Sequence, residues 1–152
     1  MKKIIYVLLF ILPITLFSAN MNKNGIVTKL SNNSVDKTMN ILSIIIKEYG
    51  AKEFTIIDHK QNANERGNFD IQEAKLIIFA ESNTCLNLLK IDPAVGLDLP
   101  LKILVYQAED NKVYIKYRDP KFLKNIYNLG QTKEANIMSD ILDKFTNIAI
   151  KK

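Results

Sequence analysis

Apolar residues recur with two different periods along this chain, and the period predicts which segments are helices. Steps of three and four over residues 35–49 give one apolar face, as in an amphipathic helix. Ser34 precedes this stripe as an N-cap, and Gly50 follows it where a left-handed backbone commonly ends a helix. A second stripe predicts a final helix over residues 132–148, whose apolar side chains we expect in the core.

Short apolar runs and two-residue alternation predict five strands, at residues 25–30, 54–57, 74–80, 101–107 and 112–117. The run 74–80 is almost wholly apolar, which predicts a central strand buried on both faces. Residues 112–117 alternate strictly, so this strand has one face in water. The order of elements favours an α+β fold, a two-layer sandwich with helices on one face of a mainly antiparallel sheet.

The connecting segments carry turn and cap signals. We expect a polar loop with at most one helical turn at 60–68, a short helix from Ser82 or Asn83 to Leu89, and an irregular segment at 92–100. Asp119 and Pro120 then begin a helix, as N-cap and first helical residue. No linker divides residues 20–152, which we interpret as a single domain.

Residues 1–19 have the layout of a secretory signal peptide. Two lysines precede an apolar run that is short for a membrane span of about 20 residues, and small residues follow it. We expect cleavage after Ala19 and release into the periplasm, with no membrane association afterwards. An uncleaved N-terminal anchor is the alternative. Phe17, three positions from the expected cleavage point, fits the preference for small residues poorly.

Charge and composition exclude several classes of function. The net charge of +5 falls to +3 without Lys2 and Lys3, and basic and acidic residues alternate without a basic stripe, so we expect no nucleic-acid partner. The glycines do not form a phosphate-binding loop, so we expect no cofactor. One histidine and one cysteine are too few for a zinc site, so we expect no metal. Cys85 is a buried apolar residue, which we favour, or else a reactive thiol or the site of an intermolecular disulfide.

The polar residues that can carry function stand at the ends of predicted elements. Asp58 and His59 end a strand, Asn83 follows another, and Asp98 and Lys102 flank the rigid Pro100. We expect these five residues to form one ligand-binding surface. For each there is a structural alternative, such as capping a loop or a helix.

Taken together, the chain resembles the Domain of Unknown Function 302 family over residues 26–130. The resemblance rests most specifically on the Ile57-Asp58-His59 segment and on Gly96-Leu97-Asp98-Leu99-Pro100-Leu101-Lys102. It is supported by residues 76–79, by 113–117 and by Asp119-Pro120. It implies a strand, a helix, four strands and a helix, similar in outline to the TATA-binding-protein fold, and a possible homodimer. It brings no known activity, and the segments 71–74 and 79–83 depart from the family's usual sequence.

Three functions remain open on the sequence. The first is a non-enzymatic module that binds a small molecule or a periplasmic protein. The second is an acid–base enzyme using His59 with Asp58 or Asp98. The third is a structural domain that dimerises. We favour the binding module, because the polar residues gather at element ends and form no recognisable catalytic set.

Overall fold

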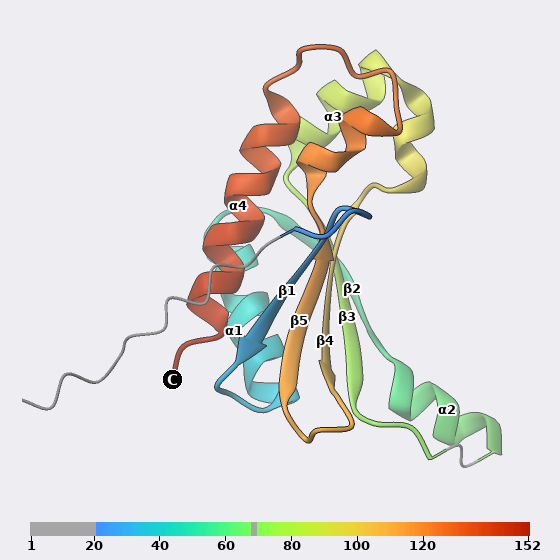
Figure 1. Ribbon diagram of the computed structural model, residues 1–152, viewed down its shortest axis with the longest axis vertical. Helices are drawn as coiled ribbons and strands as arrows, with labels where there is room; N and C mark the ends of the chain where they lie inside the picture. The colour runs from blue at the N-terminus through green and yellow to red at the C-terminus, as the bar shows by residue number, and fades with distance from the viewer. Residues whose placement is uncertain (1–20, 68–69) are drawn as a thin grey trace, which may run out of the picture.

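The computed structural model describes residues 21–67 and 70–152, which build five antiparallel strands and the helices around them (Figure 1). The strands lie in the order β1-β5-β4-β3-β2. They are β1 (Ile26–Ser31), β2 (Lys52–Asp58), β3 (Ala74–Ala80), β4 (Leu101–Gln107) and β5 (Val113–Arg118). The α-helices are α1 (Val35–Glu48), α2 (His59–Gly67), α3 (Ser82–Ile91) and α4 (Glu134–Ala149), and two 3-10 helices are η1 (Pro93–Leu97) and η2 (Pro120–Asn125).

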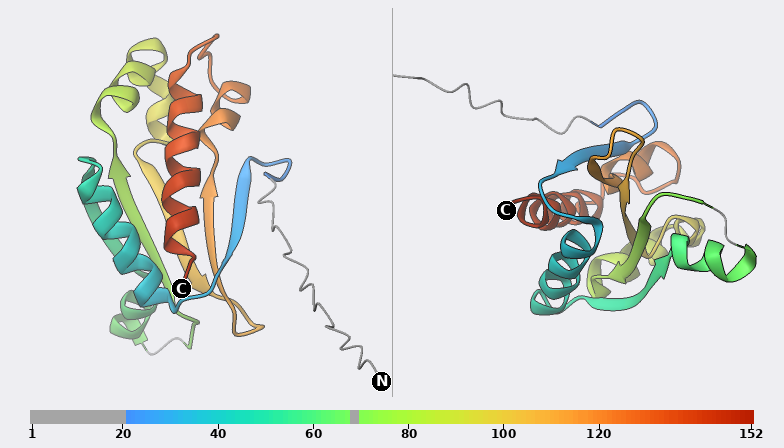
Figure 2. Two further views of the ribbon diagram at one scale, coloured as in Figure 1. Left: turned by 90° about the vertical axis from the view of Figure 1, so that its left-hand side faces the viewer. Right: turned by 90° about the horizontal axis from the view of Figure 1, so that it is seen from below.

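Helices α1 and α4 pack side by side on one face of the sheet, which gives the predicted two layers (Figure 2). Alternate strand residues face these helices, and the apolar stripes of α1 and α4 meet them. The core between the layers consists of fully buried side chains, including Ile77, Phe79, Ile103, Ile115, Leu42, Ile46, Leu142 and Phe145. The α+β fold predicted from the sequence is confirmed.

The two long helices begin and end close to where the sequence predicts. The Ser34 hydroxyl accepts a hydrogen bond from the Lys37 backbone N–H, which satisfies one of the free donors at the start of α1. Gly50 has φ +80° just after the helix, a conformation that costs glycine little. Asp119 caps η2 with Pro120 at its first turn, although this segment is a 3-10 helix and not an α-helix.

Two expectations are wrong: that residues 74–80 form a central strand buried on both faces, and that the segment after the second strand is a loop. β4 is the central strand, and β3 lies between it and the edge strand β2. Only alternate residues of β3 are buried, because one face of the sheet has no helix layer. Residues 60–67 of the predicted loop belong instead to the helix α2, which is polar all round and has no buried residue, and residue 68 lies outside the described residues. Periodicity could not detect it, because a helix without an apolar face leaves no apolar stripe.

The face of the sheet opposite α1 and α4 is open in the part of the chain that the structure describes (Figure 2). Its side chains come from the alternate strand positions, and many are apolar and half-buried, such as Ile57, Leu76, Ile78 and Leu104. Helices α3, η1 and η2 gather beyond the end of the sheet where β4 begins (Figure 1). Among the described residues, no helix is both long and apolar enough to cross a membrane.

Candidate functional site

The strongest candidate site is an open cavity of about 610 Å³ on the open face, near the start of β4. We call it the cationic cavity. Its charged lining residues are Asp98, Lys102, Lys116 and Arg118, which together carry a net charge of +2. Its apolar lining includes Ile26, Leu76, Leu97, Leu99 and Leu104. Volumes of about 300–1,000 Å³ are typical of pockets for small organic ligands.

Strand register places these side chains together. Lys102 and Leu104 are two residues apart on β4 and therefore project from the same face. Lys116 on β5 is the register partner of Leu104, and Arg118 is the partner of Ile26 on β1. With Leu76 from β3, four neighbouring strands thus contribute cations and apolar groups to one concave region. The buried residues between them, such as Ile103 and Ile115, face the helices instead.

Asp98 holds Arg118 in place at the edge of this cavity. The Arg118 Nε lies 3.3 Å from Asp98 Oδ1, and Nη1 donates a 2.7 Å hydrogen bond to the Asn24 carbonyl. The Tyr127 hydroxyl donates to Asp98 Oδ2 at 2.7 Å, and this bond is the main reason that the pKa of Tyr127 is raised. The Asp98 carboxylate is thus occupied by two partners and fixes the orientation of Arg118.

The two lysines of the cavity are differently placed. Lys102 Nζ donates to the backbone carbonyls of Asp98 and Pro100, at 2.9 and 3.1 Å. Burial lowers the pKa of Lys102, Asp98 opposes this, and the nearby Arg118 lowers it further. Lys116 Nζ lies 5.2 Å from the centre of the Tyr106 ring. Over residues 21–67 and 70–152, neither ammonium forms an ion pair with a carboxylate.

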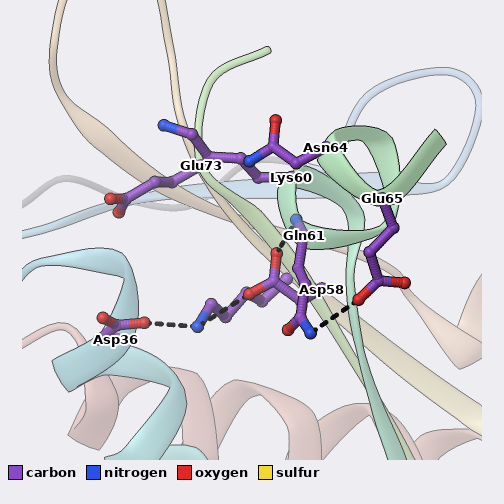
Figure 3. A pocket seen from close by; sticks show the side chains of 8 residues that line it. Asp36, Asp58, Lys60, Gln61, Asn64, Glu65 and Glu73 are labelled. Carbon is purple, nitrogen blue, oxygen red and sulfur yellow. Dashed lines mark hydrogen bonds and ion pairs between the residues drawn. The ribbon is translucent and has the colours of Figure 1, made fainter. Parts of the chain in front are cut away.

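A second cavity, of about 470 Å³, lies at the opposite end of the sheet, where β2 ends (Figure 3). Three of its six charged lining side chains form ion pairs with one another. Lys75 Nζ lies 2.7 Å from Asp36 Oδ1 and 3.1 Å from Asp58 Oδ2, and these carboxylates raise its pKa. The Gln61 backbone N–H donates to Asp58 Oδ1 at 2.9 Å and, with Lys75, lowers the Asp58 pKa. Asp58 therefore caps the start of α2 and anchors Lys75, a structural role.

The structure does not bring the five predicted site residues together on one surface. Asp98 and Lys102 share the cationic cavity, whereas Asp58 lines the cavity at the far end of the sheet. His59 is the exposed first residue of α2, and Asn83 is exposed in the first turn of α3. Strand direction explains the separation. β2 and β4 both run antiparallel to β3, so the last residue of β2 and the first residue of β4 lie at opposite ends of the sheet.

Lys116, Arg118 and Tyr127 belong to the site but were not among the predicted residues. The sequence contained one signal for Lys116, because the strict alternation of 112–117 places it on the wet face of its strand. No sequence signal placed β5 beside β4 in the register that sets Lys116 opposite Leu104. Within the described residues, no group of three or more His, Cys, Asp or Glu side chains is arranged to hold a metal ion.

Cys85 is buried in α3, as the favoured interpretation of the sequence expected. Burial, with a smaller contribution from the Glu81 carboxylate, raises the pKa of its thiol to about 11. A thiol in this environment is almost entirely protonated at neutral pH. The thiolate is the reactive species, so Cys85 is a poor nucleophile in the folded protein.

The fold and its cavity define a small two-layer α+β domain with one open sheet face. The family model described as "Domain of unknown function DUF302" matches residues 27–149, and the chain belongs to this family. A crystal structure of an uncharacterized conserved DUF302 protein from Bacillus stearothermophilus has the same fold, with a TM-score of 0.65 at 16% identity. That likeness covers 83% of this chain and 95% of the other.

Curated relatives share sequence with this chain but are longer. A protein of Brucella suis named fluoride-specific ion channel FluC 1 is 30% identical over 119 residues, which is 78% of this chain. A Brucella melitensis protein named fluoride-specific ion channel FluC 2 matches equally. The chain spans less than half the length of these relatives, 46% and 44% respectively.

Proposed function

We propose that this chain is an exported, non-enzymatic module that binds a small negatively charged molecule in the cationic cavity. The observation that carries the proposal is the pair of ammonium groups, Lys102 and Lys116, that face this cavity and have no carboxylate partner among the described residues. Arg118 adds a third cation, whose charge Asp98 offsets. An anion placed among them makes charge-assisted hydrogen bonds and relieves the repulsion between Lys102 and Arg118.

Export is proposed on the sequence alone, because residues 1–19 lie outside the described part of the chain. A signal peptide followed by a single binding domain suits a periplasmic receptor or carrier. The channel activity named for the Brucella proteins is a property of proteins more than twice as long as the match. Fluoride nevertheless belongs in the test, as the smallest anion that the comparison suggests.

The test is a titration of the purified protein with acetate, phosphate and fluoride, followed by NMR shifts of backbone amides. We expect acetate or phosphate to move amides of β4 and β5 around the cavity. The Lys102→Gln/Lys116→Gln double variant should bind these anions about tenfold or more weakly in the same titration. Lys144→Gln, which removes an exposed lysine on α4, is the matched control. Equal responses in both variants, or none in the wild type, would contradict the proposal.

A further inference from the structure

We infer that the ligand is a free amphipathic carboxylate, with its head group at Lys102 and Lys116 and an apolar chain or ring on the floor of the cavity. This inference rests on the proposed anion-binding function and names the ligand class. The carrying observation is a juxtaposition: Lys102 and Lys116, which have no carboxylate partner in the described part of the chain, border a floor formed by Ile26, Leu76 and Leu104.

The head-group position follows from the two ammonium groups. Lys102 Nζ donates two hydrogen bonds to backbone carbonyls, which leaves one N–H for a ligand. Lys116 contacts the Tyr106 ring face and keeps its hydrogen-bond donors available. Both ammonium groups thus have donors available for the oxygens of a carboxylate. Arg118 is already paired with Asp98, which also accepts a hydrogen bond from Tyr127. Arg118 therefore adds positive charge near the head group but does not make the main contact with it.

The floor explains why the rest of the ligand should be apolar. Leu76 and Leu104 are half-buried on the open face, and Leu97 at the rim is 84% exposed. An apolar side chain so exposed gains stability when a ligand removes it from water. Apart from Asn22 and the charged groups, the cavity offers few side chains able to recognise hydroxyl groups. A sugar or another polyol would lose hydrogen bonds to water here without replacing them.

A concave site favours a single free molecule over a membrane surface. Lys102 is partly buried and tied to the backbone, so its ammonium is not presented on a protruding surface. Membrane-surface proteins instead present exposed Lys and Arg that reach a flat plane of head groups. The occupant is therefore one chain lying along the sheet, and continuing onto neighbouring apolar positions such as Ile78.

Calorimetric titration of the full chain with octanoate, octanol and acetate tests the inference. These three probes separate the head group from the apolar part. We expect octanoate to bind about tenfold or more tightly than either of the others, because only octanoate uses both parts of the site. If acetate binds as tightly as octanoate, the inference fails and the anion-binding function stands. If octanol equals octanoate, or if no probe binds, the inference fails, and the anion-binding function fails with it when phosphate also leaves the amides of β4 and β5 unmoved.

Variants locate the two ends of the ligand. Leu97→Ser removes an exposed rim side chain that the fold does not need, and should weaken octanoate about threefold or more while leaving acetate unchanged. Lys116→Gln should weaken both octanoate and acetate, and Lys144→Gln neither. Binding to anionic phosphatidylglycerol vesicles without binding to free octanoate would overturn the inference in favour of a membrane surface. Insensitivity of octanoate binding to Leu97→Ser and Lys116→Gln would overturn it as well.

Discussion

At the residue scale, Glu81 shows how one carboxylate starts a helix. Its side chain accepts hydrogen bonds from the backbone N–H groups of Asn83 and Thr84, at 3.2 and 2.9 Å, and from the Thr84 hydroxyl. The contacts with Thr84 contribute most to lowering the Glu81 pKa below its usual value of 4.5. The sequence predicts a cap at Ser82 or Asn83, yet the cap is the residue before them. Glutamate is not a common N-cap, so residue preference alone points elsewhere.

Replacing Glu81 with alanine should cost about 1 kcal/mol of stability, the usual worth of an N-cap. Because the folded pKa lies below the unfolded one, the carboxylate's contribution is complete above about pH 4.5 and disappears as the pH falls through the folded pKa. Urea denaturation of the wild type and of Glu81→Ala at pH 7 and pH 3 measures this. The gap between the two proteins should narrow at pH 3, and a constant gap would contradict the assignment.

Cys85 should be silent toward thiol reagents in the folded protein. Its burial and raised pKa keep the thiol protonated, so Ellman's reagent at pH 8 should modify it only as fast as the protein opens. Addition of a denaturing concentration of guanidinium should make the reaction rapid and stoichiometric. Rapid modification under native conditions would show instead that the reactive-thiol interpretation is correct.

At the element scale, Lys29 joins β1 to α4. It is 4% exposed, and its Nζ donates to the side chains of Asp143, Thr146 and Asn147, each at 2.7 Å. A further 3.2 Å bond reaches the Asp143 carbonyl. A buried ammonium is tolerated here because α4 surrounds it with oxygen acceptors. This contact fixes α4 along the edge strand as well as over the sheet centre.

Lys29→Ala should lower the free energy of unfolding by about 2–3 kcal/mol, because buried acceptors on α4 lose a charged donor. Asp143 is more than half exposed and can turn to water, which keeps the loss below that of a fully buried ion pair. Urea denaturation gives the value. Lys144→Ala, an exposed lysine on the same helix, is the control and should change stability by about 0.5 kcal/mol or less.

Sequence patterns predicted those elements that bury one face. The stripes of α1 and α4 and the alternation of β5 depend on the contrast between core and water, which periodicity records directly. The same logic fails for α2, which buries nothing, and for β3, whose unbroken apolar run suggested two covered faces. In β3 the apolar residues on the open side remain half-exposed, and they continue the floor of the cationic cavity.

The candidate site was only half predictable for a related reason. Asp98 and Lys102 are close in sequence around a proline, so local pattern found both. Lys116 and Arg118 reach the same cavity only through the pairing of β5 with β4 and β1. Grouping Asp58 with Asp98 required knowing which end of the sheet each strand reaches. The end of the sheet that a strand reaches depends on topology, and it cannot be predicted from residue type.

At the scale of the whole molecule, the two faces of the sheet have different roles. The helix layer supplies the core, while the open face presents apolar side chains beside cations at the end near η1. Apolar surface left open in this arrangement often marks a binding region. Export would place that face where small periplasmic molecules are available.

Export itself is testable on the whole chain. Expressed in a Gram-negative bacterium and fractionated, the protein should appear in the periplasm with the denatured mass of residues 20–152. The physical reason is that the apolar run preceding Ala19 suits recognition by the secretion machinery and cleavage, and is short for a stable span. A full-length chain in the membrane fraction would support the anchor, and a cytoplasmic chain would exclude export.

The central claim, that the cationic cavity holds a small anion, is tested most directly by native mass spectrometry of the protein purified from cells. The wild type and Lys102→Gln/Lys116→Gln are compared, each with its denatured mass. We predict extra mass on the native wild type that is lost on denaturation and is missing from the double variant. A wild type without extra mass, or extra mass that persists in the double variant, would contradict the claim.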